Sequence, residues 1–122
     1  MSSLPVFLLK KLYVKKSLKN TANGFELAIQ NTIAPGTIVG MLPVVVDGKE
    51  CPLEQTRVVV AGDKTLTSTE VSARAPLQFG VGQKVIIQVD GDLLVPGPHK
   101  LVISPKTKEA GTLKIPVDDT VE

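Results

Sequence analysis

Hydrophobic and polar residues alternate along most of the chain, as they do in β-strands that have one face on a core and the other in water. In residues 25–30 every second residue is apolar, starting with Phe25, and residues 85–89 and 113–117 share this period. β-Branched residues are abundant, and runs with helical spacing are missing. The pattern predicts an all-β fold.

Turn signals separate the apolar segments at short intervals. Asn23-Gly24 and Asp47-Gly48 accept the positive φ angles of tight hairpin turns. Thr67 and Glu70 have the spacing of a capping box, which predicts a short connector there. The strands that we predict between these signals are 7–19, 25–33, 38–46, 49–51, 56–60, 84–89, 99–104 and 111–117.

Seven or eight short antiparallel strands in 122 residues predict a β-sandwich, either immunoglobulin-like or jelly-roll-like. A small β-barrel is the alternative architecture. The length is that of one domain, so we expect residues 1–122 to form a single sandwich domain.

Three runs are apolar at consecutive positions, namely 6–9, 38–42 and 58–60. Consecutive apolar residues are typical of strands that are covered on both faces. A small sandwich covers only one face of each sheet, so the surplus should meet a second copy, another subunit or an apolar ligand. We therefore expect a homo-oligomer or association with a larger protein subunit.

Composition narrows the function classes. The chain has one His, one Cys, no Trp and 3% aromatic residues, which excludes a Cys/His zinc site, an internal disulfide and stacking platforms for bases. With a net charge of +2 we expect no nucleic-acid partner. The lone Cys51 favours a reducing, cytoplasmic setting, and the run 6–9 is too short for a membrane helix, so we expect no membrane partner.

The first 20 residues carry five lysines and no acidic residue. Lys10, Lys11, Lys15 and Lys16 are candidates for binding an anionic or phosphorylated ligand. The alternative interpretation is a solvated strand whose lysines protect a sheet edge from pairing with other chains.

Candidate catalytic chemistry is sparse. His99 would need an orienting carboxylate to act as a general base, and Asp90 or Asp92 could supply it across the intervening loop. A surface histidine is the simpler interpretation. Asp90-Gly91-Asp92 falls short of a calcium-binding loop, so we expect no metal, no cofactor and no catalytic residue that acts within this chain alone. We interpret Cys51 as a partly buried structural residue.

Four sequence segments follow the lysine-bearing first segment in a characteristic order: NGFEL (23–27), VVVDGKECPLE (44–54), RVVV (57–60) and LVPGPHKL (94–101). In this order the chain resembles the small all-β subunit-like proteins of C-glycoside deglycosidases. That resemblance implies an accessory chain whose larger partner carries the metal and the catalytic residues. No site residue is carried over.

More faintly, the chain is similar to short chains that carry a hydroxymethylglutaryl-CoA reductase name. It contains none of that enzyme's nucleotide-binding or catalytic motifs, so we interpret such a name as propagated, or at most as a hint of a partner. The function we expect is a non-catalytic accessory or assembly subunit. The alternatives are a binding module for an anionic ligand and an enzyme that uses His99.

Overall fold

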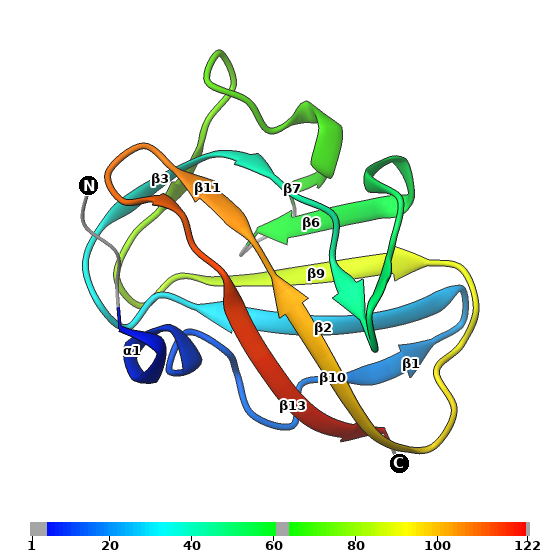
Figure 1. The fold of residues 1–122 in the computed structure, drawn as a ribbon. Helices are drawn as coiled ribbons and strands as arrows, with labels where there is room; N and C mark the ends of the chain where they lie inside the picture. The colour runs from blue at the N-terminus through cyan, green and yellow to red at the C-terminus, as the bar shows by residue number, and fades with distance from the viewer. Residues whose placement is uncertain (1–4, 61–63, 122) are drawn as a thin grey trace.

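The structure is a computed structural model that describes residues 5–60 and 64–121, and it confirms the all-β class (Figure 1). These residues form helix α1 (Val6–Lys10), two short 3-10 helices, η1 (Leu53–Gln55) and η2 (Ser68–Glu70), and strands in three sheets. The strands are β1 (Lys19–Thr21), β2 (Gly24–Gln30), β3 (Gly36–Met41), β4 (Val45–Val46), β5 (Lys49–Glu50), β6 (Thr56–Val60), β7 (Lys64–Thr67), β8 (Leu77–Phe79), β9 (Lys84–Asp90), β10 (Gly97–Ile103), β11 (Pro105–Thr107), β12 (Gly111–Thr112) and β13 (Ile115–Val121).

One layer of the sandwich is a five-stranded antiparallel sheet in the order β1-β2-β9-β6-β7. Its long central strands keep the period of two that the sequence shows. Leu27 pairs with Ile87, which also pairs with Val58 on the other side. All three side chains are buried and form the floor of the core.

The other layer consists of two four-stranded sheets, in the orders β13-β10-β4-β5 and β12-β11-β3-β8. Only Ser104 separates β10 from β11, so the chain runs almost directly from one sheet into the next. Figure 1 shows β10 and β13 crossing over β2, while β11 lies beside β3. Leu101, Ile103 and Ile115 close the core from this side. These sheets are open in the described residues, which form a sandwich and not the alternative closed barrel.

The predicted strand 7–19 is wrong. Residues 6–10 form α1, an irregular segment follows, and only Lys19 reaches a strand. Four residues of this range are buried, and three of them, Leu9, Leu12 and Tyr13, stand at the i, i+3, i+4 spacing of a helical face; the fourth is Leu18. Helical hydrogen bonds begin at Pro5, whose carbonyl accepts from the N–H groups of Leu8 and Leu9.

Other predicted bounds shift by smaller amounts. Strand 56–60 coincides with β6, and the predicted connector is η2, which has the expected capping box. The prediction 38–46 divides into β3 and β4 around Pro43, which has no N–H for a sheet ladder. The prediction 111–117 likewise divides into β12 and β13, and β13 continues to Val121. Strands β7, β8 and β11 were not predicted.

The two predicted hairpin turns differ in outcome. Asp47 and Gly48 have φ angles of 50° and 86°, as a tight turn with two positive φ residues requires. In the other hairpin Thr21 pairs with Gly24, so the turn residues are Ala22 and Asn23, and Gly24 already belongs to β2.

The predicted apolar surplus is only partly exposed. Ile38, Met41 and Val58 lie in the core, whereas Val6 and Phe7 are exposed on α1. Among the described residues, none of the helices combines the length and the apolar character that a bilayer crossing requires.

Candidate functional site

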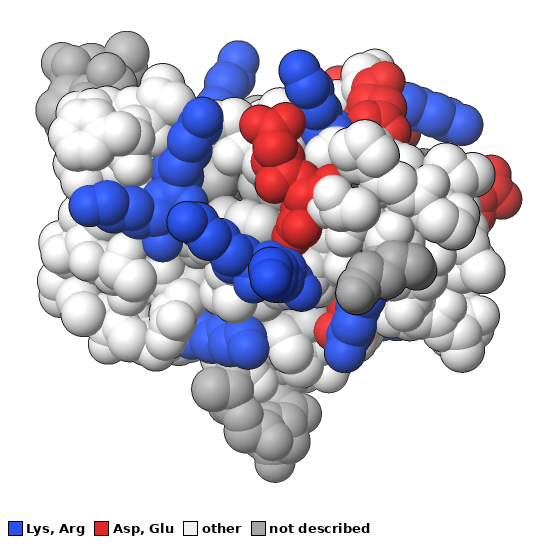
Figure 2. Space-filling model, turned by 90° about the horizontal axis from the view of Figure 1, so that it is seen from below, with Lys and Arg blue, Asp and Glu red and all other residues white. Residues whose placement is uncertain are grey.

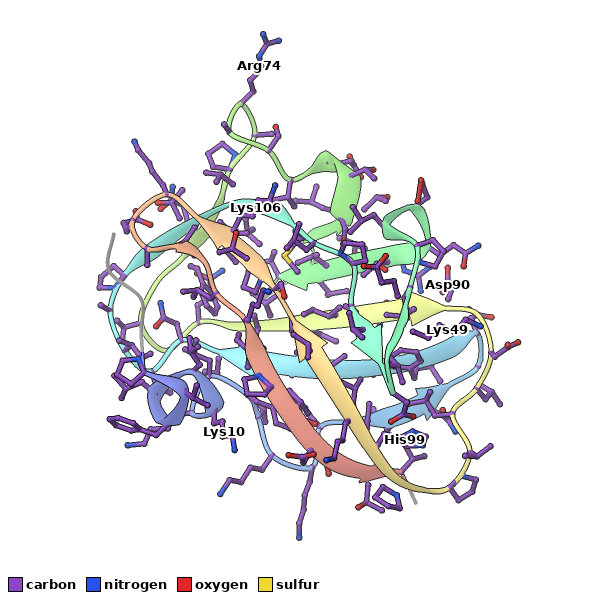
Figure 3. All side chains as sticks on the ribbon, viewed as in Figure 1. Lys10, Lys49, Arg74, Asp90, His99 and Lys106 are labelled. Carbon is purple, nitrogen blue, oxygen red and sulfur yellow. The ribbon has the colours of Figure 1, made fainter. Side chains whose placement is uncertain are left out.

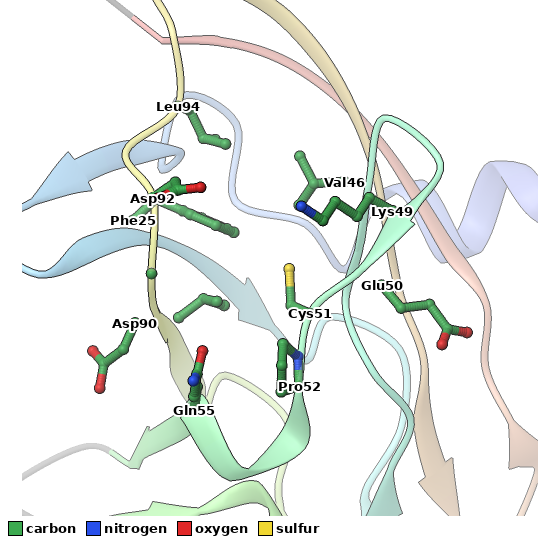
Figure 4. Close-up of a pocket in the computed structure, with 12 residues that line it drawn as sticks. Phe25, Val46, Lys49, Glu50, Cys51, Pro52, Gln55, Asp90, Asp92 and Leu94 are labelled. Atoms are coloured by element: carbon green, nitrogen blue, oxygen red, sulfur yellow. The ribbon is translucent and has the colours of Figure 1, made fainter.

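The candidate site lies where the loop of residues 91–96, between β9 and β10, faces the β4–β5 hairpin. A pocket of about 370 Å³ separates the two (Figure 4). This volume is in the range of small-molecule sites. The pocket is lined by Phe25, Val46, Lys49, Glu50, Cys51, Pro52, Gln55, Val89, Asp90, Gly91, Asp92 and Leu94.

The pocket has an apolar interior and charged groups around it. In Figure 4 the ammonium group of Lys49 and the thiol of Cys51 both project into it. Burial raises the pKa of Cys51, and this effect outweighs the nearby charge of Lys49, which lowers it. The thiol therefore stays protonated at neutral pH, which does not favour a nucleophilic role.

The 91–96 loop presents apolar side chains to solvent. The side chains of Leu93 and Val95 are 56% and 69% exposed. Between them, Leu94 is held by Asn20 on β1, whose side chain accepts from the Leu94 N–H and donates to its carbonyl, both at 2.9 Å. The exposed side chains are thus carried by a backbone that is fixed from the neighbouring sheet.

His99, on β10, fixes the same loop at a second point. The residue is 7% exposed, so the interpretation as a surface histidine is wrong. The ring contacts an oxygen atom at each nitrogen. Nδ1 lies 2.7 Å from Oδ2 of Asp47, and Nε2 lies 2.7 Å from the carbonyl oxygen of Val95. Bonding to the Val95 carbonyl, followed by bonding to Asp47, raises the pKa of His99, against the opposing effect of burial.

Asp47 links the hairpin turn to β10. Its Oδ1 accepts from the backbone N–H of Lys100 at 2.9 Å, and its other oxygen faces His99. The Lys100 N–H, followed by the His99 ring, lowers the pKa of Asp47. A single side chain therefore ties the β4–β5 turn, strand β10 and, through His99, the 91–96 loop together.

The expected pairing of His99 with Asp90 or Asp92 is not the arrangement that the structure shows. Asp90 pairs with Arg57 on β6 at 2.7 Å, and Asp92 lies at the pocket. Because the two ring nitrogens of His99 face Asp47 and the carbonyl of Val95, neither nitrogen is free to act as a base. In the described part of the chain, no three His, Cys, Asp or Glu side chains group as metal ligands would.

The candidate lysines lie on α1 and in the segment that follows it. Lys10, Lys11, Lys15 and Lys16 are all exposed. Figure 2, which views the molecule from below, shows Lys and Arg side chains gathered on this face, with acidic side chains beside them. The backbone of Lys16 is fixed, since it has a φ of 65° and its N–H donates to Asp119 at 2.9 Å.

Two residues of the site were missed in the sequence. Asn20 and Asp47 make the side-chain bonds that fix the loop and the turn, and neither is close in sequence to the group it binds. Asp47 was noted only for its turn conformation. Figure 3 places His99 near the start of β10, beside the hairpin that carries Lys49. The only signal in the sequence for Asp47 was that a polar residue directly follows a predicted strand.

Comparison with known proteins replaces the resemblance to C-glycoside deglycosidase subunits. The family model described as hydroxymethylglutaryl-CoA reductase, N-terminal domain, matches residues 8–122. No curated protein matches the chain. The family match covers nearly the whole chain and points to a different enzyme, so the deglycosidase assignment is wrong. The chain belongs to the family of hydroxymethylglutaryl-CoA reductase N-terminal domains.

Proposed function

We propose that this chain is a non-catalytic β-sandwich module that docks onto a larger protein partner, the catalytic part of a hydroxymethylglutaryl-CoA reductase. The docking surface is the 91–96 surface, which comprises the exposed side chains of Leu93 and Val95 and the mouth of the adjoining pocket. The observation that carries the proposal is that this loop presents apolar side chains to solvent on a fixed backbone.

A fixed apolar loop is suited to association because ordering a flexible loop on binding costs free energy. Here Asn20 and His99 hold the backbone before any partner arrives. Burying a large aliphatic side chain gains roughly 1.5–3 kcal/mol, so Leu93 and Val95 together can supply the centre of an interface.

The chemistry of the surroundings favours docking over catalysis. Both nitrogens of His99 are engaged, and burial keeps the Cys51 thiol protonated. Asp90 forms an ion pair with Arg57. The hydrogen bonds of His99 and the ion pair of Asp90 thus hold the loop and the strands in place.

The family supports the choice of partner. Its description names an N-terminal domain of the reductase, which is a part of a larger enzyme. A module of this kind works by packing against the remainder of that enzyme. A second copy of the chain is the competing occupant of the same surface.

The test mixes the purified chain with a purified reductase catalytic domain from the same organism and measures the complex by light scattering and calorimetry. We expect a complex whose Kd rises about tenfold or more in Leu93→Asp/Val95→Asp. Val81→Asp is the matched control, because Val81 is 60% exposed and lies at the opposite end of β9. Absence of a complex would overturn the partner, and a self-dimer lost in the double variant would assign the surface to a second copy.

A second candidate function is binding of an anionic ligand by Lys10, Lys11, Lys15 and Lys16. The exposed lysines on the face shown in Figure 2 support it. Titration with inorganic phosphate and a nucleotide at two salt concentrations tests it. Replacing all four with Gln should abolish salt-sensitive binding, whereas replacing the exposed Lys84, Lys106, Lys108 and Lys114 should leave it. Equal binding by both variants would exclude this function.

A further inference from the structure

The surroundings of the His99 ring require both of its nitrogens to carry a proton. The carbonyl oxygen of Val95 can only accept, so Nε2 must donate to it across 2.7 Å. The Lys100 N–H at the other oxygen keeps Asp47 ionised, and an ionised carboxylate has no proton to donate, so Nδ1 must donate to it as well. The ring that fits this geometry is the imidazolium ion.

A neutral His99 cannot make both bonds. Charge-assisted bonds are the stronger ones, so the remaining proton stays on Nδ1, facing Asp47. The lone pair of Nε2 then points at the carbonyl oxygen of Val95, 2.7 Å away. Two lone pairs at this distance repel, and the group that can move is the 91–96 loop, since His99 itself is fixed in β10.

Charged groups on the surrounding elements determine when the proton leaves. Asp47 faces the ring directly. Asp119 stands opposite His99 on β13, and its carboxylate is engaged by the Tyr13 hydroxyl and the Lys16 N–H. Other charged residues on the neighbouring elements are Lys49 and Glu50 on the hairpin, Asp92 in the loop, Asp118 on β13, Lys100 on β10 itself, and Lys19 on β1, which pairs with Glu26.

We propose that His99 is a proton-dependent latch for the 91–96 loop: the imidazolium holds the carbonyl of Val95, and loss of its proton releases the loop at Val95, while Asn20 still holds it at Leu94. The latch regulates the docking surface, and to that extent it rests on the proposed function. Its sign follows from the raised pKa of His99, which lies above the ordinary 6.5. The loop is held below this raised pKa and is released as the pH climbs through it.

Hydrogen exchange on the full chain, with a titration of His99 by NMR, tests the latch. Protection factors, corrected for the intrinsic pH dependence of exchange, should fall about tenfold in the 91–96 loop across the His99 titration. Leu27 and Ile87 in the central sheet report global unfolding, so their protection should fall no further than the free energy of unfolding does. Asp47→Asn, which keeps the turn, should move both the titration and the loop opening to lower pH.

His99→Gln is the second variant, because it leaves one donor and removes the titration. Its loop should exchange equally at every pH. A wild-type loop whose protection stays constant while His99 titrates would overturn the latch, whatever the protein binds. A loop that opens with His99 while affinity for the reductase domain stays constant would instead overturn the 91–96 surface as the docking site and leave the latch intact.

Discussion

Gly24 is a position where an added side chain would collide with the backbone of the neighbouring strand. A Cβ atom placed there would lie 1.9 Å from the carbonyl oxygen of Val89 and 3.1 Å from the Cα of Asp90. Both are backbone atoms of β9, so no side-chain rotation can make room. The need for glycine here comes from packing between strands, since Gly24 does not have a positive φ.

Gly24→Ala should therefore destabilise the fold by about 3 kcal/mol, because β2 or β9 must shift to remove the clash. Urea denaturation followed by circular dichroism measures the change. Gly80→Ala is the control, since its nearest neighbour is the side chain of Gln83 at 3.9 Å. Unchanged stability of Gly24→Ala would show that the strands can separate at little cost.

Ser68 is a buried polar residue whose side chain contributes no hydrogen bond to the part of the fold that the structure describes. Its side chain is 2% exposed, and its hydroxyl has no hydrogen-bond partner among the described residues. Ser68→Ala should leave the free energy of unfolding unchanged or raise it by about 1 kcal/mol. Thr56→Val should lower it by a similar amount, because the Thr56 hydroxyl donates to the Pro52 carbonyl at 2.9 Å. A loss of stability in Ser68→Ala would reveal a partner for that hydroxyl.

At the scale of elements, the sequence predicts the strands in which buried and exposed residues follow the alternation of apolar and polar residues. Strand β6 has the bounds expected from residues 56–60, and the capping box at η2 is where Thr67 and Glu70 indicated it. The strands β7 and β8 were missed because they are short and depend on pairing with β6 and β3. The segment before Lys19, which is rich in lysine and leucine, was predicted as a strand although its buried residues have helical spacing. Only five of its residues form a helix.

Tyr13 joins this N-terminal segment to β13. Its hydroxyl donates to Asp119 and accepts from the N–H of Leu18 at 3.1 Å. Burial, followed by the hydrogen bond to Asp119, raises the pKa of Tyr13 to about 12. The phenol therefore remains a donor throughout the ordinary pH range.

Tyr13→Phe should destabilise the protein by about 1–3 kcal/mol, because it leaves the buried Leu18 N–H without an acceptor. Amide exchange at Leu18 should accelerate, while the distant β6–β7 pair should exchange as in the wild type. If the exchange of both regions rises equally, Tyr13 acts on the whole fold, and its role as a local tie between two elements is wrong.

At the scale of the whole molecule, the fold class could be predicted but the candidate site could not. Alternation in the central strands is a local signal, whereas the site depends on bonds between distant residues. Asn20 and Leu94 are 74 positions apart, and Asp47 and His99 are 52 apart. His99, Asp90 and Asp92 were identified as chemistry-bearing residues, but their partners follow from how the two layers cross, which residue types do not reveal.

Hydrogen bonds between distant residues should also make the free energy of unfolding highest at an intermediate pH. Hydrogen bonds from backbone N–H groups lower the pKa of Asp47 and Glu109, from Lys100 and Thr37 respectively. Partial burial raises the pKa of Asp119, but hydrogen bonds led by that from Tyr13 outweigh it, so the net shift is downward. Carboxylates with lowered pKa values stabilise the fold above their ordinary values of 3.8 to 4.5, and this contribution is lost as the pH falls through the lowered values.

His99 limits stability on the other side. Its pKa is raised in the fold, so its contribution is complete below the ordinary value of 6.5 and is lost as the pH rises through the raised one. Urea unfolding from about pH 3 to about pH 9 should therefore show the highest free energy of unfolding between the two transitions. His99→Gln should remove the decline that begins above 6.5 and leave the acidic decline in place. An alkaline decline that persists in His99→Gln would assign it to another group and would contradict an imidazolium ion as the form of His99 that the fold requires.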